Sequence, residues 1–123
     1  MKKYIGITSR ITRNEYGSDC DSLERSYVEY FNGLGLSSVI FPNDVHQIDK
    51  LLDNINIVGI ILSGGGDVSS KYQNKSAEHG MADLQFNRDK VEETILRWAT
   101  NNRAPVLGIC RGMQMINLFL VAS

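Results

Sequence analysis

One cysteine stands where the chain is expected to turn sharply. Cys110 lies between Gly108 and Gly112, after a short apolar run and before apolar residues at helical spacing. This order of strand, tight turn and helix is typical of a nucleophile elbow, here with a thiol in place of a hydroxyl. The glycines let the strand and the helix approach closely, and a helix N-terminus stabilises negative charge on the sulfur. The pattern therefore favours a nucleophilic cysteine over a small buried one.

A run of three glycines, 64–66, is the second candidate feature and directly follows the apolar stretch 58–62. Acyl transfer needs donors for the oxyanion as well as a nucleophile, and glycines let backbone N–H groups face a substrate without interference from side chains. We expect the N–H groups of Gly65 and Arg111 to be these donors. By itself such a run is more often a flexible turn, and it lacks the Gly-Lys-Ser/Thr ending and the GxGxxG pattern of phosphate loops.

The sequence offers no obvious general base. Its two histidines, His46 and His79, lie in polar stretches and are read as solvated loop residues, although the loop of His79 leaves the expected end of the sheet. Cysteine and histidine do not occur at zinc-type spacing, and we expect no metal and no cofactor. Cys20 lies in a polar context unlike that of Cys110, so we expect no structural disulfide and a cytoplasmic location.

Alternating strands and helices must position these residues. Apolar runs predict strands at 4–8, 38–41, 58–62 and 106–109, while helical spacing predicts helices after an N-cap at Ser22, around 48–55, at 84–100 and after Cys110. This order predicts an α/β fold, an open parallel sheet with flanking helices. Loops after parallel strands gather at the carboxyl edge of a sheet. We therefore expect a polar loop at 9–21, the glycine run and Cys110 to meet there.

Composition is that of an ordinary globular chain. The 123 residues are 42% hydrophobic and 22% charged, with a net charge of −1, and suit a single domain, 1–123. Mixed charges give no reason to expect nucleic acid or an anionic membrane as a partner. No apolar run approaches the roughly 20 residues of a membrane-spanning helix, and the N-terminus does not look like a signal peptide. The oligomeric state is not indicated.

The elbow sequence Gly-Ile-Cys-Arg-Gly-Met-Gln, residues 108–114, resembles that of class I glutamine amidotransferases and, more closely, the γ-glutamyl hydrolase branch, peptidase family C26. The stretches 60–68 and 83–92 are similar to that branch as well. The resemblance implies a flavodoxin-like domain that hydrolyses a γ-glutamyl amide, such as glutamine, through a thioester on Cys110. It further implies substrate contacts at Gly64, Gly66 and Gln114.

The resemblance also implies a Cys-His-Glu triad whose histidine and glutamate come from beyond the elbow helix, whereas this sequence ends at Ser123. We therefore expect a partial domain, truncated after that helix, whose base comes from a missing C-terminal half or a complementing partner chain. The isolated chain should be nearly inactive, because proton delivery to the leaving amine is not provided. Alternatives are a glutaminase module that delivers ammonia to a synthase, a remnant that only binds, and a redox-active relative. The leaving amine is not readable from the sequence.

Overall fold

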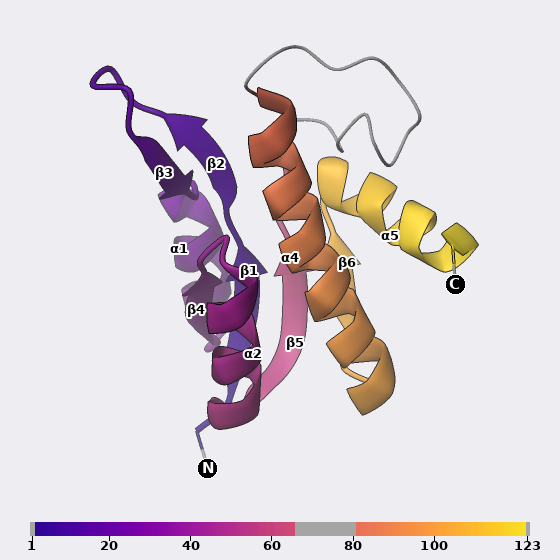
Figure 1. Cartoon of the computed structure of the whole chain (residues 1–123). Helices are drawn as coiled ribbons and strands as arrows, with labels where there is room; N and C mark the ends of the chain where they lie inside the picture. The colour runs from indigo at the N-terminus through magenta and orange to yellow at the C-terminus, as the bar shows by residue number, and fades with distance from the viewer. Residues whose placement is uncertain (1, 66–80, 123) are drawn as a thin grey trace.

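A parallel sheet forms the centre of this computed structural model, which describes the backbone of residues 2–65 and 81–122 and the side chains of residues 2–65 and 86–121 (Figure 1). In that part of the chain the sheet has four strands in the order β4-β1-β5-β6, and every neighbouring pair is parallel. The strands are β1 (Tyr4–Thr8), β4 (Ser37–Phe41), β5 (Ile57–Leu62) and β6 (Val106–Gly108). The helices are α1 (Arg25–Gly33), α2 (Val45–Asn54), α4 (Met81–Asn102) and α5 (Arg111–Ala122). The predicted open parallel α/β fold is confirmed.

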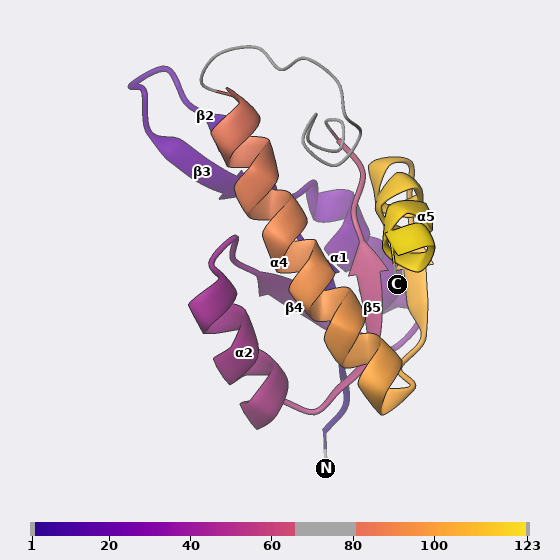
Figure 2. The same cartoon turned by 45° about the vertical axis from the view of Figure 1, so that its right-hand side comes forward.

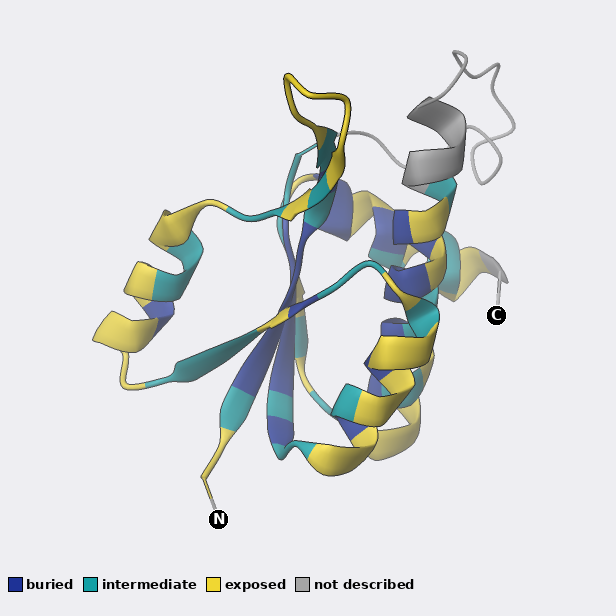
Figure 3. Cartoon of the chain, turned by 60° about the vertical axis from the view of Figure 1, so that its left-hand side comes forward, coloured by how far each residue is buried: buried dark blue, intermediate teal, exposed yellow. Residues whose placement is uncertain are grey.

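The helices lie on opposite faces of the sheet (Figure 3). Helix α1 covers one face, over a small core that includes Ile7, Phe31 and Ile61. Helices α2, α4 and α5 cover the other face, with α4 between its two neighbours (Figure 2). Side chains alternate along β5, so Ile60 and Leu62 enter the larger core under these three helices. The sheet is thus covered on both faces, as continuously apolar strands predict.

The polar loop predicted at residues 9–21 is wrong, because most of this stretch forms a β-hairpin. β2 (Arg10–Arg13) pairs antiparallel with β3 (Asp19–Ser22), and the hairpin extends beyond the carboxyl edge of the sheet (Figure 1). Its turn is held by the Asn14 side chain, which accepts hydrogen bonds from two backbone N–H groups, and by Gly17 at a φ of 80°. β3 reads Asp-Cys-Asp-Ser and has little strand propensity, so only its pairing with β2 defines it.

Helix α1 begins later than the sequence predicts. Ser22, the expected N-cap, instead ends β3, where its Oγ lies 2.7 Å from the Oγ1 of Thr12, and the residue at the N-cap position is Glu24. Within α1, Phe31 is buried, whereas Tyr30 is 65% exposed and contacts the Phe31 ring edge-on. Ser22 therefore belongs to the hairpin, although its local sequence favours a helix N-cap.

The other predicted elements are confirmed, with small differences at their ends. Helix α4 is longer than the expected 84–100, and β6 ends at Gly108 rather than Ile109 because the elbow begins there. Within residues 2–65 and 81–122, no helix has both the length and the apolar character to cross a membrane. The compartment stays a prediction.

Candidate active site

Cys110 lies in the tight turn between β6 and α5. Its φ is 52°, a left-handed conformation that is uncommon and strained for a residue other than glycine. The side chain is exposed, so the thiol is accessible at the carboxyl edge of the sheet. The N–H groups of Met113 and Gln114 donate to the Cys110 carbonyl at 3.0 and 3.3 Å, so the first turn of α5 starts directly at the cysteine. This is the local geometry expected of an elbow.

The two glycines beside the cysteine are required by close packing. A Cβ on Gly108 would lie 2.7 Å from the carbonyl carbon of Gly112 and equally close to the nitrogen of Met113. A Cβ on Gly112 would lie 2.4 Å from the carbonyl oxygen of Leu62, at the end of β5. The close approach predicted for the strand and the helix is confirmed.

The described part of the glycine loop, residues 63–65, reaches the elbow as predicted. A Cβ on Gly64 would lie 3.7 Å from the Cβ of Cys110. The Gly64 N–H donates to the hydroxyl oxygen of Tyr27 on α1 at 3.1 Å, and Gly65 has a φ of 90°. Among described residues, the N–H groups of Gly65 and Arg111 have no hydrogen-bond acceptor. Gly66 lies outside the described residues.

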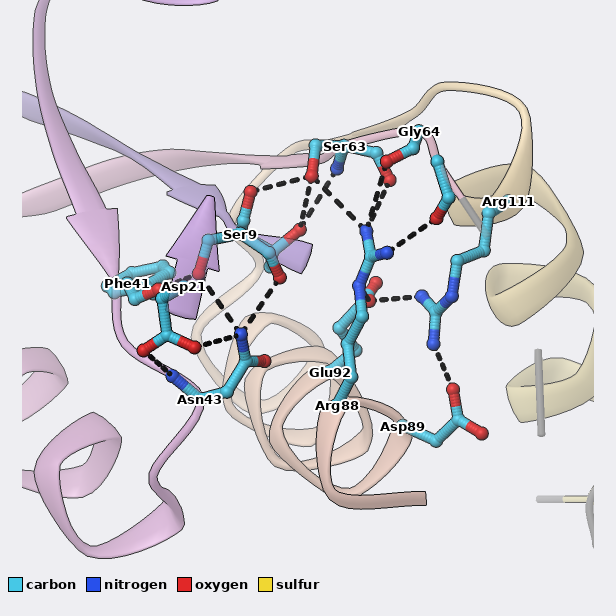
Figure 4. Close-up of polar contacts among 12 residues, drawn as sticks. Ser9, Asp21, Phe41, Asn43, Ser63, Gly64, Arg88, Asp89, Glu92 and Arg111 are labelled. Carbon is cyan, nitrogen blue, oxygen red and sulfur yellow. Dashed lines mark hydrogen bonds and ion pairs between the residues drawn. The ribbon is translucent and has the colours of Figure 1, made fainter. Parts of the chain in front are cut away.

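Four buried charged side chains lie behind this loop; we call Arg88, Asp89, Glu92 and Arg111 the charged cluster (Figure 4). The Oε1 of Glu92 accepts from the Nε of Arg88 at 3.0 Å and from the Nη1 of Arg111. The Nη2 of Arg111 donates to the Oδ1 of Asp89. Two guanidinium groups and two carboxylates therefore compensate one another where water is excluded.

The guanidinium of Arg88 holds the backbone of the glycine loop. Its Nη1 donates to the carbonyl oxygen of Gly65 at 2.6 Å, and its Nη2 donates to those of Ser63 and Gly64 at 2.9 and 3.3 Å. Nη2 also lies 3.3 Å from the Ser63 hydroxyl. One side chain of α4 thus binds three consecutive carbonyl groups of the loop.

Burial and charge act in opposite directions inside the charged cluster. Burial lowers the pKa of Arg88, and the carboxylate of Glu92 opposes this shift. Burial also raises the pKa of Glu92, and the guanidinium groups of Arg111 and Arg88 oppose that shift. The partners therefore offset part of the cost of burial, and removing one of them leaves more of that cost on the other.

The β2–β3 hairpin brings a further cation to the rim of the site. A Cβ on Gly65 would lie 2.7 Å from the Nη1 of Arg10, whose other terminal nitrogen forms an ion pair with Glu24. The Nδ2 of Asn43 anchors the hairpin by donating to the carbonyl of Ser9 at 3.1 Å and to Asp21 at 2.9 Å (Figure 4). The hairpin therefore borders the glycine loop.

The remaining predicted residues are less informative. Gln114 is exposed on the first turn of α5, next to the elbow. His46 is exposed at the start of α2, whereas His79 lies outside the described residues. Both cysteines are free thiols. In the described ranges, no group of three or more histidine, cysteine or acidic side chains is arranged to hold a metal ion.

Sequence reasoning missed the charged cluster, although a signal for it exists. Arg88 and Glu92 recur at the helical spacing of Val91, Ile95 and Leu96, and so occupy core-facing positions of α4. Charged residues at such positions are rarely buried unless they are paired. The side chain of Arg111 is also buried and paired, whereas the sequence predicted a role only for its backbone N–H.

Sequence comparison places the chain among proteins of the glutamine amidotransferase type. It is 28% identical to the glutamine amidotransferase-like protein RP404 of Rickettsia prowazekii, over 95% of this chain and 43% of that protein. It is 31% identical to the gamma-glutamyl-CDP-amidate hydrolase of Campylobacter jejuni, over 92% of this chain and 53% of that protein. The chain thus spans about half the length of these relatives.

The sequence model of the family Peptidase C26 matches residues 3–121, nearly the whole chain. The chain therefore belongs to the Peptidase C26 family. The names of these relatives are those of a glutamine amidotransferase-like protein and of a gamma-glutamyl-CDP-amidate hydrolase.

Proposed function

We propose that Cys110 is the nucleophile of a hydrolase that cleaves a γ-glutamyl amide. The observation that carries this proposal is the left-handed conformation of an exposed cysteine, φ 52°, at the start of α5 and beside the glycine loop. Backbone strain at a residue other than glycine persists only where the surrounding structure enforces it, and it clusters at functional sites. Membership of the Peptidase C26 family supports the same reading.

The reaction would proceed in two halves. The thiolate of Cys110 attacks the γ-carbonyl carbon, and the carbonyl electron pair moves onto oxygen, where the N–H groups of Gly65 and Arg111 donate to it. The C–N bond then breaks, a proton goes to the leaving nitrogen, and a γ-glutamyl thioester remains. Water attacks the thioester, releases glutamate and returns the thiol.

The proton transfers require a base that we propose is supplied from outside residues 1–123, by a further segment or a partner chain. Of the two histidines, the structure describes His46, which is exposed at the start of α2. A positioned general acid or base contributes about 10²–10⁴-fold to a rate. We therefore expect negligible turnover of unactivated amides by the 123-residue chain.

Two substrate classes remain in the proposal. The name of the Campylobacter jejuni relative supports hydrolysis of a γ-glutamyl amide other than glutamine. The name of the Rickettsia prowazekii relative supports action on glutamine, and we propose as the second class a glutaminase that supplies ammonia to a synthase partner. Cleavage of γ-glutamyl amines by the protein alone would favour the hydrolase. Release of ammonia from glutamine only in the presence of a partner chain would favour the glutaminase.

Acylation by an activated ester tests the nucleophile without the need for a general acid or base. A γ-glutamyl nitrophenyl ester loses nitrophenolate, which leaves without a proton, so the first half-reaction needs only the thiolate and the oxyanion donors. We expect a burst of nitrophenolate and, by mass spectrometry, one γ-glutamyl group on Cys110.

The controls use the chain's own second thiol. Cys110→Ala should abolish the burst, whereas Cys20→Ala should leave it intact, because Cys20 lies in the hairpin strand β3. The homologous β-aspartyl ester should react more slowly, since its shorter side chain places the carbonyl away from the donors. Equal labelling of both cysteines, or no preference for the γ-glutamyl ester, would contradict the proposed nucleophile.

A further inference from the structure

The charged cluster connects the glycine loop to the elbow, because Arg88 binds the carbonyl of Gly65 and Glu92 binds the guanidinium of Arg111 (Figure 4). We infer that Arg88 and Glu92 are positioning residues for the oxyanion hole. Arg88 sets the direction of the Gly65 N–H, and Glu92 sets the separation between that N–H and the N–H of Arg111. The inference rests on the proposed function of Cys110.

The first step concerns the direction of one peptide plane. The carbonyl of Gly64 and the N–H of Gly65 belong to the same trans peptide group and point in opposite directions. The Nη2 of Arg88 binds the Gly64 carbonyl at 3.3 Å from the side of α4. The Gly65 N–H must therefore point away from Arg88. The bond from Nη1 to the Gly65 carbonyl, at 2.6 Å, fixes the next plane as well.

The second step concerns the elbow. The backbone N–H of Arg111 follows Cys110 directly, while its side chain, only 1% exposed, extends back to α4. There its guanidinium is bound by Asp89 and Glu92. Movement of the first residue of α5 would thus break two buried ion pairs, so the position of this N–H is tied to helix α4.

The third step concerns the contact between the arginine that holds the glycine loop and the arginine of the elbow. A single atom, the Oε1 of Glu92, accepts from the Nε of Arg88 at 3.0 Å and from the Nη1 of Arg111. Within the described residues, the Oε2 of Glu92 has no hydrogen-bond partner. One oxygen therefore bridges the guanidinium that holds the loop and the guanidinium of the elbow residue. Because oxyanion donors act by preorganisation, their separation matters as well as their presence.

Stability alone does not account for this arrangement. A buried ion pair gains little over well-packed apolar side chains, because desolvation offsets most of the attraction between the charges. A flexible apolar side chain would not, however, bind three consecutive carbonyl groups in fixed directions, as the planar guanidinium of Arg88 does.

The test compares two reagents on the same thiol. Acylation by the γ-glutamyl nitrophenyl ester passes through an oxyanion, whereas alkylation by iodoacetamide does not. In Arg88→Lys and Glu92→Gln, acylation of Cys110 should slow at least about tenfold, since loss of one oxyanion donor costs on the order of 100-fold or more. The rate with iodoacetamide should be unchanged. The matched control is Glu93→Gln, one position along α4, where the carboxylate pairs with Arg97 at the surface; neither rate should change.

The outcomes separate this inference from the proposed function. If the ester does not acylate Cys110 in the wild-type chain while iodoacetamide alkylates it, the proposed function fails. If the wild type is acylated and Glu92→Gln is acylated equally fast, the inference alone is overturned. Equal slowing of both reagents would also overturn it, because that result indicates general disruption of the elbow.

Folding of the variants is followed by circular dichroism and urea unfolding. If Glu92→Gln does not fold, the double variant Arg88→Gln/Glu92→Gln replaces it, since it keeps the net charge of the cluster at zero and leaves the Arg111–Asp89 pair intact. The ratio of the acylation rate to the alkylation rate is then measured for the double variant. The outcomes given above for Glu92→Gln apply to it unchanged.

Discussion

Helix α4 carries two arginine–glutamate pairs of the same spacing in opposite surroundings. The Nε of Arg88 lies 3.0 Å from the Oε1 of Glu92, and both side chains are fully buried. The Nη2 of Arg97 lies 2.8 Å from the Oε1 of Glu93, and these side chains are 64% and 30% exposed. The distances are nearly equal, so the difference between the pairs lies in what surrounds them.

Surroundings decide what each pair can do. The exposed pair is solvated and screened by salt, and such pairs contribute only about 0–1 kcal/mol. The buried pair also holds the carbonyl groups of the glycine loop and the guanidinium of Arg111, so its loss leaves several groups unsatisfied. Ion pairs with equivalent local geometry can thus be a minor surface feature or the link between two parts of a site.

The largest effect is expected from truncating the two arginines. Arg88→Ala should lower the free energy of unfolding by about 3–5 kcal/mol, because Glu92 and the loop carbonyls remain buried without a donor. Arg97→Ala should lower it by only about 0–1 kcal/mol. Urea denaturation of both variants measures the contrast. Equal losses would mean that burial does not distinguish the pairs.

A smaller contrast is expected from replacing the glutamates. Glu92→Gln keeps a carbonyl acceptor but removes the charge, and should cost about 1.5–3 kcal/mol, the range for hydrogen bonds to charged groups. Glu93→Gln should cost about 0.3–0.5 kcal/mol, typical of an exposed i,i+4 pair. Thermal unfolding at matched pH provides the measurement, and a larger loss for Glu93→Gln would contradict the comparison.

The smallest effect is the response to salt. A double-mutant cycle on Glu93 and Arg97 should give a coupling energy of about 0.3–0.5 kcal/mol at low salt, and it should vanish near 1 M sodium chloride, where the Debye length is about 3 Å. The coupling between Arg88 and Glu92 should persist at both concentrations, because solvent does not reach either side chain. Loss of the buried coupling in salt would show that water enters the cluster.

Features that depend on neighbouring residues are predictable from the sequence, whereas features that depend on contacts between separate segments are not. The apolar runs of β1 and β5 and the glycine-flanked Cys110 are local patterns, and all were recoverable from the sequence. The hairpin strand β3 was not, because its polar residues become a strand only through pairing with β2. For the same reason local propensity favours Ser22 as a helix cap that it does not form.

The sequence by itself determined the order of strands and helices, the elbow and the glycine loop, because periodicity and glycine placement act over a few neighbouring residues. Only the tertiary structure decided that Arg111 meets Asp89 and Glu92 across 22 and 19 positions of the chain. Which charges are buried depends on how α4 lies against β5 and α5, and burial is what separates Arg88 and Glu92 from Arg97 and Glu93.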